Sequence, residues 1–194
     1  MEIILVRHTT PKVNPGQCYG QLDCNLTSNA ATEMERTKKV LKSYAPKYAK
    51  IYSSPLKRCA LLAQHLAATN EIVYDERLKE LNFGEWEGKA WADIKDERYH
   101  YWFEDFANRR PPQGESLQDL YNRVLAFKDE VESKGEERVI LVTHSGVIRC
   151  FLRMALQFPL NKLYSLPLNY GSLSQIAFHE KSDNLTKITA FNIY

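Results

Sequence analysis

Two histidines in this sequence each follow a run of apolar residues with the same pattern. Ile4-Leu5-Val6-Arg7-His8 and Ile140-Leu141-Val142-Thr143-His144 both have the composition of a buried strand that ends at a histidine. The carboxyl ends of neighbouring parallel strands meet at one edge of a sheet, where ligands bind. A histidine at a strand end can also simply satisfy a neighbouring carbonyl. Two such histidines together favour a shared site.

Two arginines add positive charge to the same region. Arg7 ends the first apolar run, where a buried guanidinium needs an anionic partner, and Arg58 lies in the first turn of a helix expected after the short strand Lys50–Ser53. A cation at a helix N-terminus opposes the helix dipole, which is tolerated when a bound anion lies between them. Either arginine alone could be a solvated surface side chain. Two guanidiniums beside two histidines favour phosphate as the ligand.

The overall composition indicates that any anion site is local. The 194 residues are 44% hydrophobic, and 26 Lys and Arg against 24 Asp and Glu leave a formal charge of only +2. Neither nucleic acid nor a membrane is therefore an expected partner. The opening apolar run Ile3–Val6 is too short for a signal peptide or a membrane span, so a cytoplasmic protein is expected.

The cysteines do not suggest a disulfide framework or a zinc knuckle. They are irregularly spaced and include no C-x-x-C pair, at Cys18, Cys24, Cys59 and Cys150. Such spacing is typical of reduced thiols in a cytoplasmic protein.

The strand patterns predict an α/β fold. Glu2–Arg7 and Arg138–Thr143 are unbroken runs of β-branched residues and leucine, as in parallel strands that are covered on both faces. Leu173–His179 and Leu185–Ile193 predict an antiparallel hairpin around the turn Ser182-Asp183-Asn184. We expect a three-layer α/β/α architecture, with a mostly parallel central sheet, flanking helices and a late antiparallel edge strand.

Helix starts are indicated by residues that commonly cap them. Thr27, Ser54 and Ser116 are candidate N-caps, and Pro55 suits the first position of the second helix. Apolar residues recur at helical spacing after each cap, and a fourth such set continues from His144.

The chain is expected to form a single domain over residues 1–194. No repeat, low-complexity tract or linker divides it. A helical insertion is predicted at about 89–112, and its aromatic and charged core, Trp91 to Asn108, could form a lid. The oligomeric state is left open by the sequence.

Five groups of residues, in this order, resemble the blocks of the histidine phosphatase superfamily and span residues 3 to about 150. They are Arg7-His8 with Asn14, Ser53-Ser54-Pro55-Leu56-Lys57-Arg58, Leu78-Lys79-Glu80-Leu81-Asn82-Phe83-Gly84-Glu85-Trp86-Glu87-Gly88, Pro112-Gln113-Gly114-Glu115-Ser116 and Thr143-His144-Ser145-Gly146. The agreement of all five in order, rather than of any one, carries the resemblance.

The resemblance implies catalytic roles and a small phosphorylated metabolite as substrate. His8 would be the nucleophile, and Glu80 would be the proton donor. The phosphate would be surrounded by further polar side chains, at Arg7, Arg58, His144 and Asn14. Nearby guanidiniums should lower the pKa of His8 and keep it neutral, and they offset phosphoryl charge, so no metal or other cofactor is expected.

Thr9 departs from the family pattern. The family usually has glycine directly after the nucleophile, followed by a Gly-Glu pair, whereas Thr9-Thr10-Pro11 follows His8 here. The Thr9 side chain is expected either to narrow the site or to add a hydroxyl donor for the phosphate. The charged members of the pattern are all present, so a catalytically inactive protein is not indicated.

The loop from Asn14 to Asp23 is similar to the substrate-side loop of α-ribazole 5′-phosphate phosphatases, which serve assembly of the cobalamin lower ligand. Tyr19 would then stack on the base or sugar, with Gly16 and Gly20 allowing tight turns beside it. An ordinary packed turn would have the same composition.

Four other functions are kept as alternatives. Within the family, these are a broad small-phosphoester phosphatase and a phosphoglycerate mutase, although the chain lacks obvious room for a mutase's insertions between Glu80 and Pro112. Outside the family, they are a catalytically silent phosphoester-binding module and a zinc protein. The zinc ligands would be His8, His144, Cys18 and Cys24. Paired arginines would repel a divalent metal from such a site.

Overall fold

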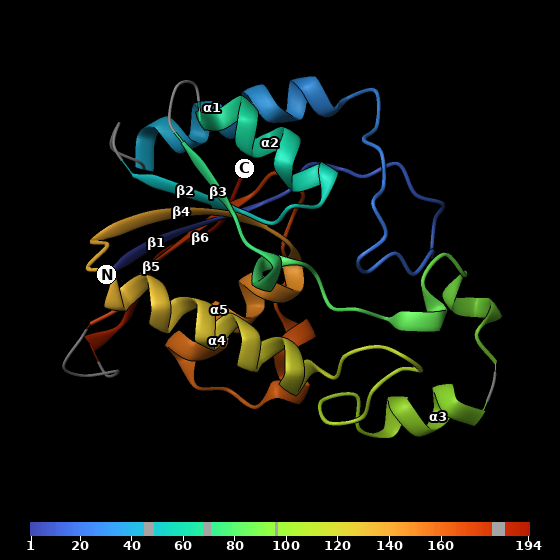
Figure 1. The fold of residues 1–194 in the computed structure, drawn as a ribbon. Coiled ribbons are helices and arrows are strands. Elements are labelled where there is room, and N and C mark those ends of the chain that lie inside the picture. Colours follow the sequence, from blue (N-terminus) through green and yellow to red (C-terminus); the bar gives the residue numbers. More distant parts are fainter. Residues whose placement is uncertain (45–48, 68–70, 96, 180–184) are drawn as a thin grey trace.

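A six-stranded sheet forms the centre of the structure. The computed structural model describes residues 1–44, 49–67, 71–95, 97–179 and 185–194, and within them the strand order is β3-β2-β4-β1-β5-β6. The strands are β1 (Glu2–Arg7), β2 (Lys50–Ser53), β3 (Ile72–Tyr74), β4 (Arg138–Thr143), β5 (Leu173–Ala177) and β6 (Lys187–Ile193). Helices cover both faces of the sheet (Figure 1). The predicted three-layer α/β fold is confirmed.

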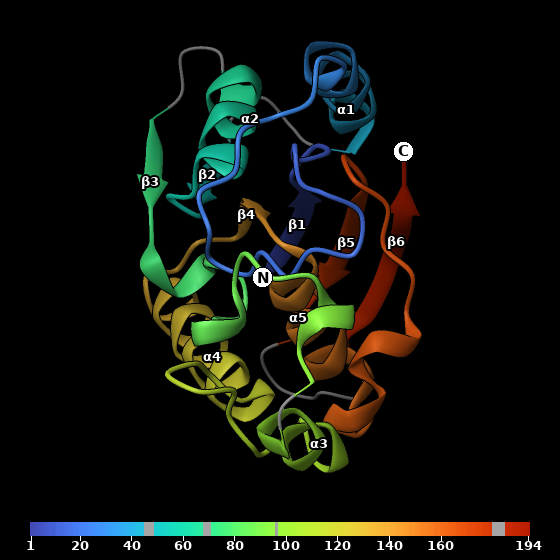
Figure 2. The same ribbon diagram turned by 90° about the vertical axis from the view of Figure 1, so that its right-hand side faces the viewer.

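β1, β2, β3 and β4 are parallel, and their registers bring the predicted site residues together. Arg7 lies opposite Thr143, and the backbone N–H of His8 donates to the Thr143 carbonyl at 3.0 Å. Ser54 N–H donates to the Val142 carbonyl at 3.0 Å. His8, His144 and Ser54 therefore follow the carboxyl ends of three adjacent strands, at the edge that faces the viewer in Figure 2.

The two late strands pair antiparallel, as predicted. β6 pairs with β5, while the predicted turn at 182–184 lies outside the described residues. β5 also pairs antiparallel with β1, with Leu173 opposite Val6. The start of β5 therefore lies beside the carboxyl end of β1, which places the segment before Leu173 next to His8.

The two helical layers bury opposite faces of β1. α1 (Ala30–Tyr44) and α2 (Lys57–Ala67) cover one face, and α4 (Leu117–Ser133) and α5 (Ser145–Leu156) cover the other (Figures 1 and 2). Ile4 and Val6 pack toward α1 and α2, while Ile3 and Leu5 pack toward α4 and α5. In the described part of the chain, no helix is both long and apolar enough to cross a membrane.

Two of the predicted helix starts need correction. α1 begins at Ala30 and not directly after Thr27, because the Thr27 hydroxyl has no hydrogen-bond partner among the described residues and therefore makes no capping bond, whereas Glu33 N–H donates to the Asn29 carbonyl at 3.1 Å. α2 begins at Lys57, two residues later than predicted; the Ser54 hydroxyl still accepts from Leu56 N–H at 3.3 Å.

The other two predicted helix starts are confirmed. Ser116 caps α4 through a capping box with Asp119. His144 occupies the N-cap position of α5.

The segment predicted as an insertion contains one short helix and an aromatic cluster. α3 (Glu97–Glu104) follows a 3-10 turn at Trp91–Asp93, and Trp86 and Trp102 pack with Cys18. Three backbone hydrogen bonds tie this segment to the loop after β1: Cys18 N–H to Lys89 O, Gly88 N–H to Cys18 O and Trp91 N–H to Gly16 O. The segment therefore anchors the loop that carries Tyr19.

Candidate active site

His8 and His144 form the centre of a buried cluster. Their ring centroids are 5.1 Å apart, and the two residues are 1% and 0% exposed. This proximity follows directly from the pairing of β1 with β4, since each histidine is the first residue after its strand. The two imidazoles predicted to share a pocket are thus brought together.

The hydrogen bond of His8 fixes its neutral tautomer. Nδ1 lies 2.7 Å from the carbonyl oxygen of Thr9. A carbonyl can only accept, so Nδ1 carries the proton and donates it. A neutral imidazole has one proton, which leaves the Nε2 lone pair free to act as a nucleophile.

His144 adopts the opposite tautomer. Arg58 Nε donates to His144 Nδ1 at 3.3 Å, so Nδ1 is an acceptor and the proton resides on Nε2. Nε2 lies 2.9 Å from the Ser54 hydroxyl oxygen and donates to it. His144 is therefore held between the helix start of α2 and the guanidinium of Arg58.

Electrostatics keep both imidazoles uncharged. Burial, followed by the charges of Arg58 and Arg7, lowers the pKa of His8 well below its ordinary value of 6.5. Burial, followed by the charge of Arg58 and the neighbouring His8, lowers the pKa of His144 in the same way. At neutral pH His8 thus has the protonation state that nucleophilic attack requires.

The arginines are held by backbone carbonyls. Arg58 is 0% exposed, and its Nη1 and Nη2 donate to Leu22 O and Gly20 O, each at 2.6 Å. Arg7 Nη1 donates to Leu168 O. Arg7 Nε is buried without a hydrogen-bond partner among the described residues, so one donor of this guanidinium remains available to a ligand.

The Glu80 carboxylate lies at the N-terminus of α5, the helix that begins directly after His144. Its carboxylate accepts from Gly146 N–H at 3.0 Å and 3.1 Å, from the Ser145 hydroxyl at 3.2 Å and from Leu81 N–H at 3.1 Å. Free N–H groups at a helix start favour such an anion. A methyl group at Gly146 would overlap Glu80 Oε1, so any larger residue there would displace the Glu80 carboxylate.

Arg123 holds the backbone that carries Glu80. Its guanidinium donates to the carbonyls of Arg77, Lys79 and Glu80 at 2.6, 2.7 and 2.9 Å and pairs with Glu115 at 2.9 Å. The sequence reasoning missed Arg123. The available signal was a charged residue beside the apolar stripe of α4.

Two tyrosines from distant segments meet above the cluster. The Tyr19 and Tyr170 hydroxyl oxygens are 3.0 Å apart. Arg58 Cζ lies 5.2 Å from the Tyr19 ring centroid, and Arg7 Cζ lies 3.8 Å from that of Tyr170. Tyr19 was a predicted site residue and Tyr170 was not.

Thr9 and Asn14 occupy different environments. Thr9 is 0% exposed, and its hydroxyl has no hydrogen-bond partner within the described ranges. Asn14 lies at an exposed turn, where its N–H donates to Gln17 Oε1 at 3.0 Å. In the part of the chain that the structure describes, no hydrogen bond or ring contact joins Asn14 to the histidine cluster, so its phosphate contact stays a prediction.

Metal-ligand geometry is absent from the described residues. They contain no group of three or more His, Cys, Asp or Glu side chains that could hold a metal ion. The residues of the zinc alternative are therefore not assembled into a ligand set. Cys18 packs instead in the aromatic cluster, where burial, followed by the charge of Glu87, raises the pKa of its thiol to about 12.

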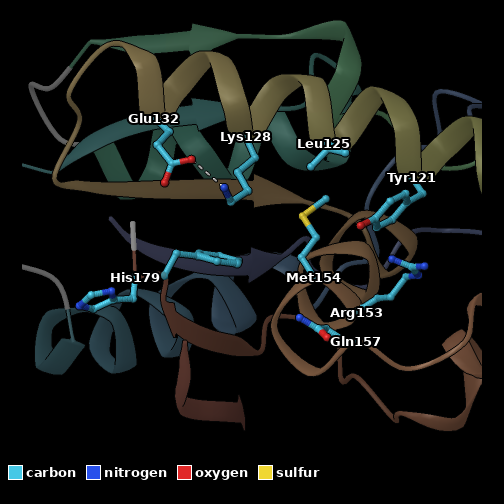
Figure 3. A pocket seen from close by; sticks show the side chains of 9 residues that line it. Tyr121, Leu125, Lys128, Glu132, Arg153, Met154, Gln157 and His179 are labelled. Atoms are coloured by element: carbon cyan, nitrogen blue, oxygen red, sulfur yellow. Dashed lines mark hydrogen bonds and ion pairs between the residues drawn. The ribbon is translucent and has the colours of Figure 1, made fainter. Parts of the chain in front are cut away.

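A separate cavity lies between α4, the end of α5 and the segment after β5. Its volume is about 690 Å³, and its lining includes Tyr121, Lys128 and Arg153 (Figure 3). The Arg153 guanidinium lies 4.2 Å from the Tyr121 ring centroid. None of the residues of the histidine cluster lines this cavity.

Known proteins share both the sequence pattern and the fold. Residues 3–190 match the family model of the histidine phosphatase superfamily (branch 1). Phosphoserine phosphatase 1 of Hydrogenobacter thermophilus is 31% identical over 200 residues, which cover 97% of this chain and 92% of that protein.

Two solved structures superpose over almost the whole chain. Mycobacterial glucosyl-3-phosphoglycerate phosphatase has a TM-score of 0.86 at 25% identity, covering 100% of this chain and 99% of its own. A putative α-ribazole-5′-P phosphatase from Escherichia coli has a TM-score of 0.88 at 22% identity, covering 99% and 96%. With the family match extending over residues 3–190, this chain belongs to the histidine phosphatase superfamily and is a phosphatase of that type.

Proposed function

We propose that this phosphatase hydrolyses phosphate monoesters through a phosphohistidine on His8. The observation that carries the proposal is the hydrogen bond from Nδ1 to Thr9 O, which leaves the Nε2 lone pair directed away from that bond. Nε2 attacks phosphorus, the P–N bond forms and the P–O bond to the leaving group breaks. Water then attacks the same phosphorus, which frees His8 and releases inorganic phosphate.

The arginines supply the charge that phosphoryl transfer needs. Arg7 and Arg58 face the histidines with guanidiniums already held by carbonyls, so little reorganisation is needed when the dianion binds. Arg7 Nε and the Thr9 hydroxyl are buried donors without partners among the described residues. Phosphoryl oxygens would satisfy both donors, and activity is therefore expected in EDTA.

Glu80 would manage the proton in both steps. As the acid, it donates a proton to the leaving alkoxide; as the carboxylate, it then takes a proton from the attacking water. Its carboxylate lies at the start of α5, where it accepts from the N–H of Gly146, two residues after His144 in the sequence. His144, neutral and held by Ser54 and Arg58, would contact the phosphoryl group.

For the substrate, the proposal is α-ribazole 5′-phosphate, with release of α-ribazole and phosphate during assembly of the cobalamin nucleotide loop. Support comes from the loop resemblance and from Tyr19 and Tyr170, which present aromatic rings beside the phosphate-binding arginines. A benzimidazole nucleoside offers aromatic surface that such rings bind.

Phospho-L-serine is the second candidate. The observation in its favour is the match to phosphoserine phosphatase 1 of Hydrogenobacter thermophilus, at 31% identity over 97% of this chain. The leaving group of phospho-L-serine is compact and charged, so this substrate would gain little from aromatic stacking. The two candidates therefore make different demands on the ester side of the site.

The test is phosphate release in EDTA from four compounds: α-ribazole 5′-phosphate, phospho-L-serine, 3-phosphoglycerate and p-nitrophenyl phosphate. A kcat/KM preference of about a hundredfold for the first, or about 2.7 kcal/mol of transition-state binding, supports the cobalamin role. The same preference for phospho-L-serine would instead support a phosphoserine phosphatase. Similar slow rates on all four compounds would indicate a broad phosphatase.

Two variants test the mechanism. His8→Ala should abolish turnover, whereas His65→Ala, a histidine in the last turn of α2, should leave it unchanged. Activity that survives in His8→Ala would refute the phosphohistidine. Conversion of 3-phosphoglycerate to 2-phosphoglycerate would identify a mutase, and phosphate binding without any turnover would identify a silent module.

A further inference from the structure

The contact between Tyr19 and Tyr170 joins two loops that are far apart in sequence. Their hydroxyls are hydrogen-bonded at 3.0 Å across a separation of 151 residues. Both loops lie at the carboxyl edge of the parallel strands, seen face-on in Figure 2, where the loop after β1 crosses this edge. The pair lies beside the nucleophile, with the ring centroids of Tyr170 and His8 5.5 Å apart.

Each tyrosine ring faces one of the phosphate-binding arginines. The Tyr170 ring centroid lies 3.8 Å from Arg7 Cζ and 5.5 Å from the His8 ring centroid. The Tyr19 ring centroid lies 5.2 Å from Arg58 Cζ. Beneath the pair, Arg58 and His8 are 0% and 1% exposed. The two rings therefore lie directly against the side chains that the proposed function places around the phosphate.

The backbone holds Tyr170 at this position. Gly171 N–H donates to the His8 carbonyl at 3.1 Å, and Arg7 N–H donates to the Ser172 carbonyl at 3.0 Å. Gly171 has φ of +69°, and a methyl group there would meet Thr37 Oγ1. Tyr170 is thus attached directly to the nucleophile's own strand end, and its placement does not depend on the distant insertion.

Proton counting indicates what the pair does when substrate enters. Burial, followed by the neighbouring Tyr170, raises the pKa of Tyr19, so its hydroxyl stays protonated at neutral pH. Two phenols carry two protons, and the bond between them uses one. A phosphoryl dianion accepts from both at once, and hydrogen bonds to an ionised acceptor are roughly twice as strong as neutral ones. Exchange of the neutral bond for charged ones favours the bound state.

We propose that Tyr170 is a substrate-binding residue of this phosphatase: its hydroxyl leaves Tyr19 and donates to the phosphoryl group held by Arg7 and Arg58. The inference rests on the proposed function only in placing the phosphoryl group beside these arginines. Tyr170 takes no part in proton transfer or bond cleavage. It acts on affinity, and the closed Tyr19–Tyr170 pair limits access to His8.

The first experiment measures binding of inorganic phosphate by calorimetry, together with steady-state kinetics on p-nitrophenyl phosphate. Tyr170→Phe removes the hydroxyl and keeps the ring over Arg7. We expect about a tenfold rise in both the phosphate Kd and KM, with kcat within about threefold. The matched control is Tyr44→Phe, at the end of α1, which leads to the opposite edge of the sheet and should change neither quantity.

The second experiment measures access to His8 without any turnover, as the rate of its modification by diethyl pyrocarbonate, followed by peptide mass spectrometry. Tyr19→Phe and Tyr170→Phe should each speed modification several-fold, and the double variant should be no faster than either, because one hydrogen bond is removed in all three. Unchanged phosphate affinity in Tyr170→Phe overturns the inference, and so does an unchanged His8 modification rate in both single variants.

The outcomes also separate this inference from the proposed function. If no phosphohistidine forms on wild-type protein but Tyr170→Phe weakens phosphate binding, the mechanism fails and the assignment of Tyr170 stands. If phosphohistidine forms and phosphate binds equally to wild type and Tyr170→Phe, the mechanism stands and the assignment of Tyr170 is wrong.

Discussion

Replacement of Glu80 by glutamine removes an acid while preserving its surroundings. The carboxylate accepts from Gly146 N–H, Leu81 N–H and the Ser145 hydroxyl. In Glu80→Gln the amide oxygen can keep the two backbone donors, and the amide N–H can donate to Ser145 Oγ, which is able to accept. The net change in stability should therefore be on the order of one hydrogen bond, about 1 kcal/mol.

The catalytic effect should be far larger and should depend on the leaving group. Loss of a general acid costs about 10²- to 10⁴-fold, or about 2.7 to 5.4 kcal/mol of transition-state stabilisation. An alkyl phosphate should show this loss fully, because its alkoxide must be protonated. p-Nitrophenolate leaves as a stable anion, so formation of phosphohistidine from p-nitrophenyl phosphate should be nearly unaffected.

The assay compares the two substrates by steady-state and rapid-mixing kinetics. With p-nitrophenyl phosphate, Glu80→Gln should release about one nitrophenolate per His8 in a burst, followed by slow turnover, because water attack now lacks its base. The control is thermal unfolding of Glu80→Gln, which should show a folded protein within about 1 kcal/mol of the wild-type stability. Equal losses on both substrates with no burst, or undiminished turnover of the alkyl ester, would refute the assignment of Glu80.

Four further predictions follow from the structure. Gly146→Ala should displace the Glu80 carboxylate, since its methyl group would overlap Oε1, and should lower kcat at least about tenfold without unfolding the protein, as measured by kinetics and circular dichroism. The lowered pKa of His8 predicts that kcat/KM stays level as pH falls to 6.5 and declines only below that pH. Arg58→Gln removes one of the charges that lower this pKa, so it should move the decline to higher pH. An unmoved pH profile in Arg58→Gln would contradict this role of Arg58. Because unfolding lets His8 regain its ordinary affinity for protons, the free energy of unfolding should fall as pH drops through about 6.5. Ser116→Ala should cost about 1 kcal/mol in denaturant unfolding through loss of the α4 cap, with kcat unchanged.

The parts of the site that local patterns control were predicted from the sequence. His8 and His144 each end an apolar run, and parallel strands carry such ends to one edge, so their meeting required only that the strands be adjacent. Arg58 followed from a helix start, although α2 begins two residues later than Pro55.

The parts that depend on long-range pairing were not predicted. Tyr170 reaches His8 only because β5 runs antiparallel to β1, and the strand pattern of Leu173–His179 does not reveal its neighbour in the sheet. Arg123 binds three carbonyls, and backbone acceptors leave no trace in residue types. Thr27 was wrong as a cap because its hydroxyl makes no hydrogen bond to the described part of the chain.

The position of β1 has a consequence for synthesis of the protein. Its two neighbours in the sheet, β4 and β5, both come from the last third of the chain. At roughly 5 to 20 residues per second, the ribosome needs on the order of 10 s to progress from β1 to β4. During that time the four apolar residues Ile3–Val6 have no strand partner, so they stay unpaired in the nascent chain, and the histidine cluster should form only late in translation.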